Sequence, residues 1–285
     1  MKGGVQMSAT NRTRTLWAVS DLHINAPGNR DIVADYVKPH SPQDWLIVAG
    51  DISERLETVI DVLRELRERF DQVIFTPGNH ELYAQQQDQF KGRDRYDALI
   101  SACRSIGVIT PEDRFPEFAG HTIVPMFTLW DHSWRDRRLS PQQAIDSAVE
   151  KGIVLTDHWA ISPYVDVPQW CRDRLKYTVG RLSEVSGPTI LVNHWPLVRE
   201  AMHGIKADEI ALWSGTRHTE AWPTRYYATS VIYGHLHFPK RFLEENVTHI
   251  EVSLGYPREW QRSLQPRLER KLWPYAVLTE EVSIP

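Results

Sequence analysis

Short apolar runs, each followed by polar side chains, recur along this chain of 285 residues. The runs are rich in β-branched and aromatic residues, which is typical of buried strands. Each run leads into Asp, Asn or His, in several cases directly after a glycine. Polar side chains just past parallel strands lie where open α/β sheets bind ligands, so these strand ends are the candidate functional site. The predicted strands are residues 17–20, 45–49, 73–76, 189–192 and 230–233.

Amphipathic segments separate the first of these strands. Residues 53–70 carry apolar side chains at the i, i+3, i+4 and i+7 spacing of a helix, and Ser53 is expected to cap its start. Shorter helices are predicted over 29–38 and 96–106, the latter followed by a short strand at 107–109. Two strand–helix–strand units within the first eighty residues predict a parallel core sheet.

The pattern is less regular after Pro111. We expect a strand over 121–129, a mostly helical stretch over 141–185 and a partly helical one over 207–227. The final third predicts short antiparallel strands within 231–242, 247–254 and 273–278. The chain is predicted to form a single domain over residues 1–285, with residues 1–13 flexible and 110–185 a candidate insertion over the site.

Composition narrows the class of protein. Apolar residues make up 41% and charged residues 25%, as in soluble globular proteins. The net charge of −4 makes nucleic acid an unlikely partner. Two cysteines without metal-binding spacing indicate reduced thiols. Without a secretory h-region or an apolar run of spanning length, the expected location is cytoplasmic and no membrane partner is expected; no pattern indicates an oligomeric state.

The polar residues at the strand ends form a candidate metal site. Asp21 and His23 lie two residues apart, as do His235 and His237, so each pair would point to one side of an extended strand end. Carboxylates mixed with imidazoles, without thiolate, suit Mn, Fe or Zn better than Ca. Seven candidate ligands exceed the needs of one tetrahedral zinc and fit two metals that share a carboxylate.

Five ordered motifs carry a resemblance to a known family. They are Asp21-Leu22-His23, Gly50-Asp51, Gly78-Asn79-His80-Glu81, Asn193-His194 and Gly234-His235-Leu236-His237. Singly, such residues could cap turns or pack in a core, but the ordered set resembles the calcineurin-like metallophosphoesterases, most nearly an uncharacterised bacterial subgroup. The resemblance implies an α/β fold: a four-layer α/β/β/α sandwich with mixed central sheets.

The resemblance also implies roles for these residues, with two divalent metal ions (Mn, Fe or Zn) as cofactors. Asp21, His23 and His237 would hold one metal, Asn79, His194 and His235 the other, and Asp51 would bridge them. A hydroxide bridging the metals would attack phosphorus, with His80 facing the substrate as a general acid or as a stabiliser of the phosphoryl oxygens. Ile24 and Glu54 depart from residues common in the family, but neither is a ligand in its pattern.

These features predict a metal-dependent hydrolase of phosphate esters. A phosphomonoesterase acting on a small nucleotide or sugar phosphate is favoured, since aromatic and arginine-bearing loops suit a compact substrate. The alternative is a phosphodiesterase, and a hypothesis from another class is a non-catalytic protein-binding scaffold of the same fold. Asn79, His80 and Arg217 are the candidate residues for binding the substrate phosphate, and His80 and Asp51 are the candidate catalytic residues. A run of positive charge could either lie in solvent or clamp a phosphate; it consists of Arg135, Arg137 and Arg138. Three tryptophans could either stack on a ring of the substrate or pack in the core; they are Trp130, Trp134 and Trp213.

Overall fold

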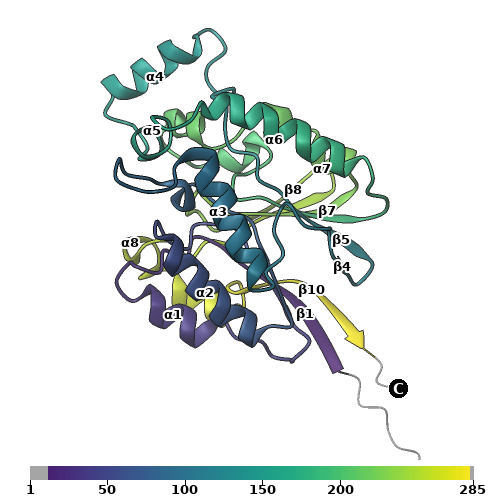
Figure 1. The fold of residues 1–285 in the computed structure, drawn as a ribbon. Coiled ribbons are helices and arrows are strands. Elements are labelled where there is room, and N and C mark those ends of the chain that lie inside the picture. The colour runs from purple at the N-terminus through teal and green to yellow at the C-terminus, as the bar shows by residue number, and fades with distance from the viewer. Residues whose placement is uncertain (1–11, 283–285) are drawn as a thin grey trace, which may run out of the picture.

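The first of two stacked sheets is built around the N-terminal strands. The computed structural model describes residues 12–282. Figure 1 shows β1 and β10 side by side, and their antiparallel pairing joins the two ends of the described chain. β1, β2 and β3 pair in parallel, as predicted. The order is β10-β1-β2-β3, with β1 at Arg12–Val19, β2 at Trp45–Val48, β3 at Gln72–Phe75 and β10 at Tyr275–Val282.

The second sheet is also mixed. Its central strands β5, β6, β7 and β9 run parallel, whereas β4 and β8 pair antiparallel with β5 and β9. The antiparallel expectation for the C-terminal strands therefore holds for β8 and β10, is wrong for β7, and holds for β9 only on its side facing β8, because β9 pairs in parallel with β7. The order is β4-β5-β6-β7-β9-β8, with β4 at Glu117–Phe118, β5 at His121–Pro125, β6 at Thr189–Val192, β7 at Ala228–Tyr233, β8 at Arg241–Glu244 and β9 at Val247–Glu251.

Helices cover the outer faces of both sheets (Figure 1). The α-helices are α1 at Asn29–Tyr36, α2 at Leu56–Arg69, α3 at Gly92–Ser105, α4 at Pro141–Glu150, α5 at Asp157–Ala160, α6 at Val167–Leu182, α7 at Trp222–Arg225, α8 at Pro257–Trp260 and α9 at Leu264–Glu269. The 3₁₀ turns are η1 at His80–Leu82, η2 at Arg199–Met202, η3 at Asp208–Trp213 and η4 at Arg217–Thr219.

Three hydrophobic cores separate four layers. One lies between the two sheets and joins residues such as Ile47 and Ile190. A second packs the first sheet against α1, α2 and α3, and a third packs the second sheet against α6 and its neighbours. Alternate residues of each strand face opposite sides, so a strand buried on both faces feeds two cores. The predicted α/β/β/α sandwich with mixed sheets is confirmed.

Several predicted boundaries were wrong. The chain leaves the sheet at Pro125 rather than at residue 129, and 107–109 contributes a single bridge from Ile109 to Ile74. α2 begins at Leu56, and Ser53 does not cap it, because its Oγ accepts from the Arg55 amide instead. Of the segment predicted to be flexible, residues 1–11 lie outside the described residues and residues 12–13 begin β1.

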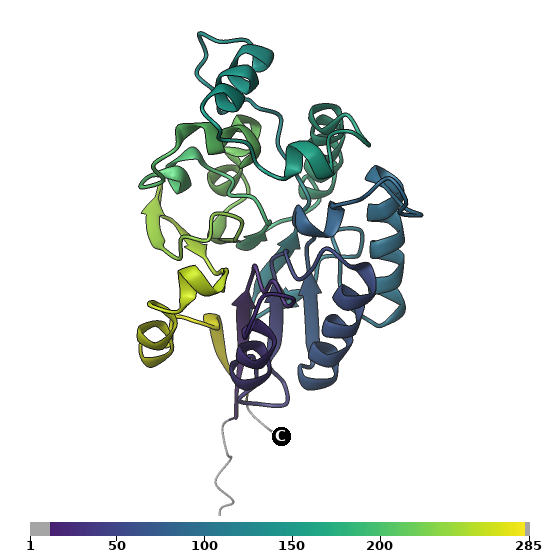
Figure 2. The same ribbon diagram turned by 90° about the vertical axis from the view of Figure 1, so that its left-hand side faces the viewer.

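The segment over 110–185 and the C-terminal helices lie on opposite sides of the strand ends. Figure 2 shows the helices after β9, in yellow, beside the first strands, whereas α4 projects at the far edge of the molecule. Cys103 and Cys171 are buried free thiols, as expected. Among residues 12–282, no helix combines the length and the apolar character that crossing a membrane would require.

Candidate metal centre

The predicted metal ligands meet at the carboxyl ends of five strands. They follow β1, β2, β3, β6 and β7, which run parallel within their sheets, so these ends come together along one edge of the sandwich. In the described part of the chain, these side chains form two neighbouring groups of potential ligand atoms that share one carboxylate: Asp21, His23, Asp51 and His237, and Asp51, His194 and His235. A third group of potential ligand atoms joins His23 with Glu54 and His80.

The first group is compact and buried. His237 Nε2 lies 3.0 Å from Asp21 Oδ1 and 3.0 Å from His23 Nε2. Asp21 is fully buried, and His23 is 4% exposed. The potential ligand atoms of this group, with that of Asp51, lie within 4.8 Å of one another. One cation could contact all of them.

The second group is centred on the amide oxygen of Asn79. Asn79 Oδ1 lies 2.9 Å from both His194 Nε2 and His235 Nδ1. Asp51 Oδ2 lies 3.3 Å from His194 Nε2. Asp51 therefore faces both groups, which is the position that a bridging ligand requires.

The backbone at these residues is not the extended strand end that we predicted. Five of the seven residues have positive φ: Asp21 at 51°, His23 at 38°, Asp51 at 58°, His235 at 69° and His237 at 50°. Left-handed conformations cost free energy in residues other than glycine and cluster at functional sites. The tight turns after the strands, rather than the alternation of an extended chain, aim each pair of side chains inward.

Two motif glycines are required by close approach. A Cβ at Gly234 would collide with Ser20 Oγ and Asp21 Oδ2, and one at Gly78 would collide with Asp51 Oδ1. Any side chain at these positions would displace a carboxylate of the site. The two glycines are therefore required for the position of the carboxylates in the site, and not only for the turns.

Hydrogen bonds around the two groups hold their ligand atoms in a form suited to a cation. His194 Nδ1 donates to the Ala49 carbonyl, and His237 Nδ1 lies 2.8 Å from Glu259 Oε2. In a neutral ring bonded in this way, Nε2 carries a lone pair that points at the oxygens of the site. Many acceptors facing one another are repulsive unless a cation lies between them, so the donor set fits divalent metal ions.

The charges in the site are strongly coupled. Burial alone would raise the pKa of Asp21, but the charge and hydrogen bond of His237 lower it to about 2. Burial likewise opposes the charged form of His194, yet Asp51 raises the pKa of this imidazole to about 9. The imidazoles that face Asp21 and Asp51 therefore keep these two buried carboxylates ionised.

Glu81 joins two of the motif loops, a role that sequence analysis missed. Its buried carboxylate accepts the backbone N–H groups of Asp51 at 2.9 Å, Ile52 at 2.6 Å and Gly78 at 2.7 Å. Burial, with the charge of Asp51, raises the pKa of Glu81 to about 7. Its position in the third motif was the available signal.

His80 lies beside the two groups and is held from the other side by Glu54. Glu54 Oε1 is 2.6 Å from His80 Nδ1, while His80 Nε2 lies 3.8 Å from Asp51 Oδ2. Burial would lower the pKa of His80, but Asp51 and Glu54 outweigh it and raise that pKa. Sequence analysis noted Glu54 only as a departure from the family pattern; the structure gives it a contact in the site.

The candidate insertion over 110–185 also reaches the site. Asp157, the first residue of α5, is 1% exposed, and its Oδ2 lies 3.0 Å from the Tyr83 hydroxyl and 3.4 Å from Asn79 Nδ2. Tyr83 also accepts from Asn79 Nδ2 at 3.0 Å. This pair turns the amide so that its oxygen faces His194 and His235. No sequence motif marks Asp157.

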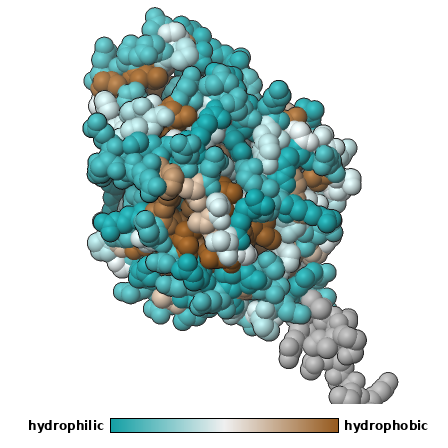
Figure 3. Space-filling model, in the orientation of Figure 1, coloured by the Kyte–Doolittle hydropathy of each residue, from teal (hydrophilic) through white to brown (hydrophobic). Residues whose placement is uncertain are grey.

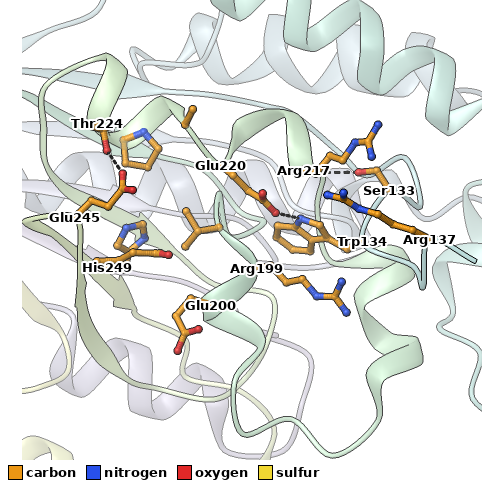
Figure 4. A pocket seen from close by; sticks show the side chains of 14 residues that line it. Ser133, Trp134, Arg137, Arg199, Glu200, Arg217, Glu220, Thr224, Glu245 and His249 are labelled. Atoms are coloured by element: carbon orange, nitrogen blue, oxygen red, sulfur yellow. Dashed lines mark hydrogen bonds between the residues drawn. The ribbon is translucent and has the colours of Figure 1, made fainter.

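Arg217 lines a different cavity, of 550 Å³, to which none of the predicted metal ligands contributes. Figure 4 shows its guanidinium group on the same side of this cavity as those of Arg137 and Arg199. A role for Arg217 at the phosphate therefore stays a prediction. Trp130 and Trp213 are fully buried and belong to the core rather than to a stacking surface. Trp134 is 2% exposed and lines the same cavity as Arg217.

The fold and the site define the class of the protein. The family model described as calcineurin-like phosphoesterase matches residues 14–239, and the chain belongs to this family. It is a metal-dependent phosphoesterase, as predicted, and the non-catalytic hypothesis is not needed.

The chain is similar to PptH of Mycobacterium tuberculosis, both in sequence and in a solved structure. The acyl-carrier-protein phosphodiesterase PptH is 44% identical over 259 residues, which cover 87% of this chain and 80% of PptH. A crystal structure of phosphopantetheinyl hydrolase PptH matches with 42% identity and a TM-score of 0.85, over 94% of this chain and 95% of the other. These relatives favour the phosphodiesterase alternative over the small-molecule phosphomonoesterase that sequence analysis preferred.

Proposed function

We propose that the protein is a phosphodiesterase that removes the phosphopantetheinyl group from acyl carrier proteins. The observation that carries this proposal is the similarity to PptH along nearly the whole chain, together with a complete set of ligand atoms in the site. The substrate is then a diester on a protein, rather than the small nucleotide or sugar monoester favoured by sequence analysis. A carrier-protein substrate agrees with the predicted cytoplasmic location.

The residues would divide as the two groups suggest, with two divalent ions, Mn, Fe or Zn. Asp21, His23 and His237 would hold one ion, and Asn79, His194 and His235 the other. Asp51, which faces both groups, would bridge the two ions. When bound, such ions lower the pKa of water and neutralise charge on the phosphoryl oxygens.

His80 would handle the phosphoryl group itself. Its Nδ1 is engaged by Glu54, so Nε2 is the nitrogen that faces the site. From there it would donate to an ester oxygen while the bond between phosphorus and the carrier-protein oxygen breaks. Water supplies the hydroxyl group to phosphorus, and the proton goes to the leaving oxygen. The products are the unmodified carrier protein and phosphopantetheine.

Mass spectrometry of a carrier protein bearing phosphopantetheine tests this function. With Mn²⁺, the protein should release phosphopantetheine, and Asp51→Asn should abolish the release. Paired nitrophenyl phosphates would compare monoester with diester. Rapid turnover of the monoester, with no turnover of either the diester or the carrier protein, would overturn the proposal in favour of a phosphomonoesterase.

A further inference from the structure

A groove leads away from the metal centre on the side of His80. This cavity of 860 Å³ lies between α2, α3, the loop after η1 and the start of α5. Two of its lining residues, Glu54 and Tyr83, also contact the His80 ring. The groove therefore begins beside the position that the proposed function gives to the phosphoryl group.

The floor of the groove is apolar. Figure 3 shows hydrophobic side chains gathered in a hollow over α2 and α3. Leu56 and Ile60 line it from α2, and Ala98, Leu99 and Ala102 line it from α3. The small alanine side chains leave room above α3. Such a floor favours an occupant with alkyl surface.

The charges around the groove do not favour a polyanion. Arginine contributes three residues, whereas aspartate and glutamate contribute four, so there is no excess of positive charge. Neutral polar groups occupy the rim. Gln85 and Gln89 line it from the glutamine-rich loop after η1, and Thr156 lines it just before α5. Amide side chains donate and accept hydrogen bonds at once, so they match amide groups of a ligand.

We propose that this groove binds the pantetheinyl arm of the substrate. This inference rests on the proposed function, because the arm must extend from the phosphoryl group that His80 contacts. The arm is a linear, uncharged chain with a dimethyl-substituted carbon and two amides. It passes Tyr83, lays its alkyl groups along the floor formed by α2 and α3, and presents its amides to the glutamine rim. The groove thereby selects phosphopantetheine over other diesters.

Ala98→Trp tests the groove by filling it, and Ser105→Trp is the matched control. Ser105 is exposed on the same helix and is not among the residues that line the groove. The ratio of kcat/KM for the modified carrier protein to that for bis(p-nitrophenyl) phosphate should fall at least tenfold in Ala98→Trp, mainly through KM. Ser105→Trp should leave the ratio within twofold. Free pantetheine should inhibit the wild type competitively and Ala98→Trp at least tenfold more weakly.

Each outcome separates the groove from the proposed function. If the wild type cleaves the small diester but not the carrier protein, the proposed function fails. If the wild type cleaves the carrier protein while Ala98→Trp keeps the wild-type ratio, only the groove assignment fails. A third outcome is that unmodified carrier protein inhibits the wild type but not Ala98→Trp, whereas pantetheine inhibits neither. The groove would then bind the folded part of the carrier protein, and this inference would be overturned.

Discussion

Glu54 Oε1 lies 2.6 Å from His80 Nδ1, and the same imidazole packs on the ring of Tyr83 with 4.4 Å between ring centroids. The hydrogen bond from His80 also lowers the pKa of Glu54 to about 2, so the carboxylate stays ionised at neutral pH. An imidazole held on two sides keeps one nitrogen directed at the site. His80 and its neighbour Asn79 thus have different contacts, and we predict different roles for them.

His80→Ala should keep the metals and lose most turnover. Proton transfer or donation by a positioned side chain contributes roughly 10²–10⁴-fold to rate, so kcat should fall by about that factor. Glu54→Gln keeps a side chain of similar size but removes the charge, and we expect a smaller loss of about tenfold. Steady-state kinetics and elemental analysis on the same samples give both readouts. Metal loss in His80→Ala would show that His80 is a ligand.

Asn79→Ala should weaken one of the two metals, and Asp157→Ala should do so more mildly. Asp157 and Tyr83 orient the Asn79 amide, and removal of such a supporting partner typically costs about 10–100-fold in metal affinity. Isothermal titration calorimetry with Mn²⁺ measures the affinities of the two metal sites separately. Asp146→Ala, at an exposed carboxylate of α4, is the control and should change neither. If Asp157→Ala and the control bind Mn²⁺ with equal affinities, Asp157 does not support the metal site.

Glu81→Ala should destabilise the fold by roughly 3–5 kcal/mol. Three buried backbone N–H groups lose their acceptor, and each unsatisfied group costs about 1–3 kcal/mol before relaxation. Urea unfolding in the presence of a chelator measures this without a contribution from metal. Glu68→Ala, on the exposed face of α2, should stay within about 0.5 kcal/mol of the wild type. A loss below 1 kcal/mol in Glu81→Ala would mean that the two loops hold their geometry unaided.

Metal removal should lower both activity and thermal stability. Ions that bind only the folded chain stabilise it by about 2.7 kcal/mol at a concentration one hundred times Kd. A chelator should therefore abolish turnover and reduce Tm, and Mn²⁺ should restore both. Asp51→Asn should show a much smaller rise of Tm with Mn²⁺, since Asp51 belongs to both ligand groups. An undiminished rise in this variant would place the stabilising metal elsewhere.

Acid should destabilise the fold partly through His249. This residue of β9 is 1% exposed and stacks on Phe242, and burial lowers its pKa from 6.5 to about 4. Between these values the unfolded chain binds a proton that the folded chain does not, so the free energy of unfolding falls as the pH drops through this window. The wild type should lose roughly 2–3 kcal/mol more than His249→Phe between pH 7 and pH 4. Urea unfolding with a chelator at both pH values checks this, and equal losses would contradict it.

The sequence alone was sufficient for the ordered motifs and most of the strands that carry them. Apolar runs such as 73–76 form strands because they can be buried on both faces, and a parallel arrangement brings their carboxyl ends to one edge. The predicted order of strands and motifs therefore assigned Asp51 and His194 to one site, although they are far apart in the chain. It also supported a two-metal phosphoesterase.

Only the tertiary structure revealed which residues support the site and where its groove runs. The contacts of Asp157 with Asn79 and of Glu54 with His80 join segments 78 and 26 residues apart, so no local pattern marks them. The left-handed turns at Asp21 and His23 depend on packing between loops, which overrides the extended geometry that spacing suggests. The groove, likewise, exists only because α2 and α3 pack beside the loop that follows His80, with two alanines of α3 among the residues that line it.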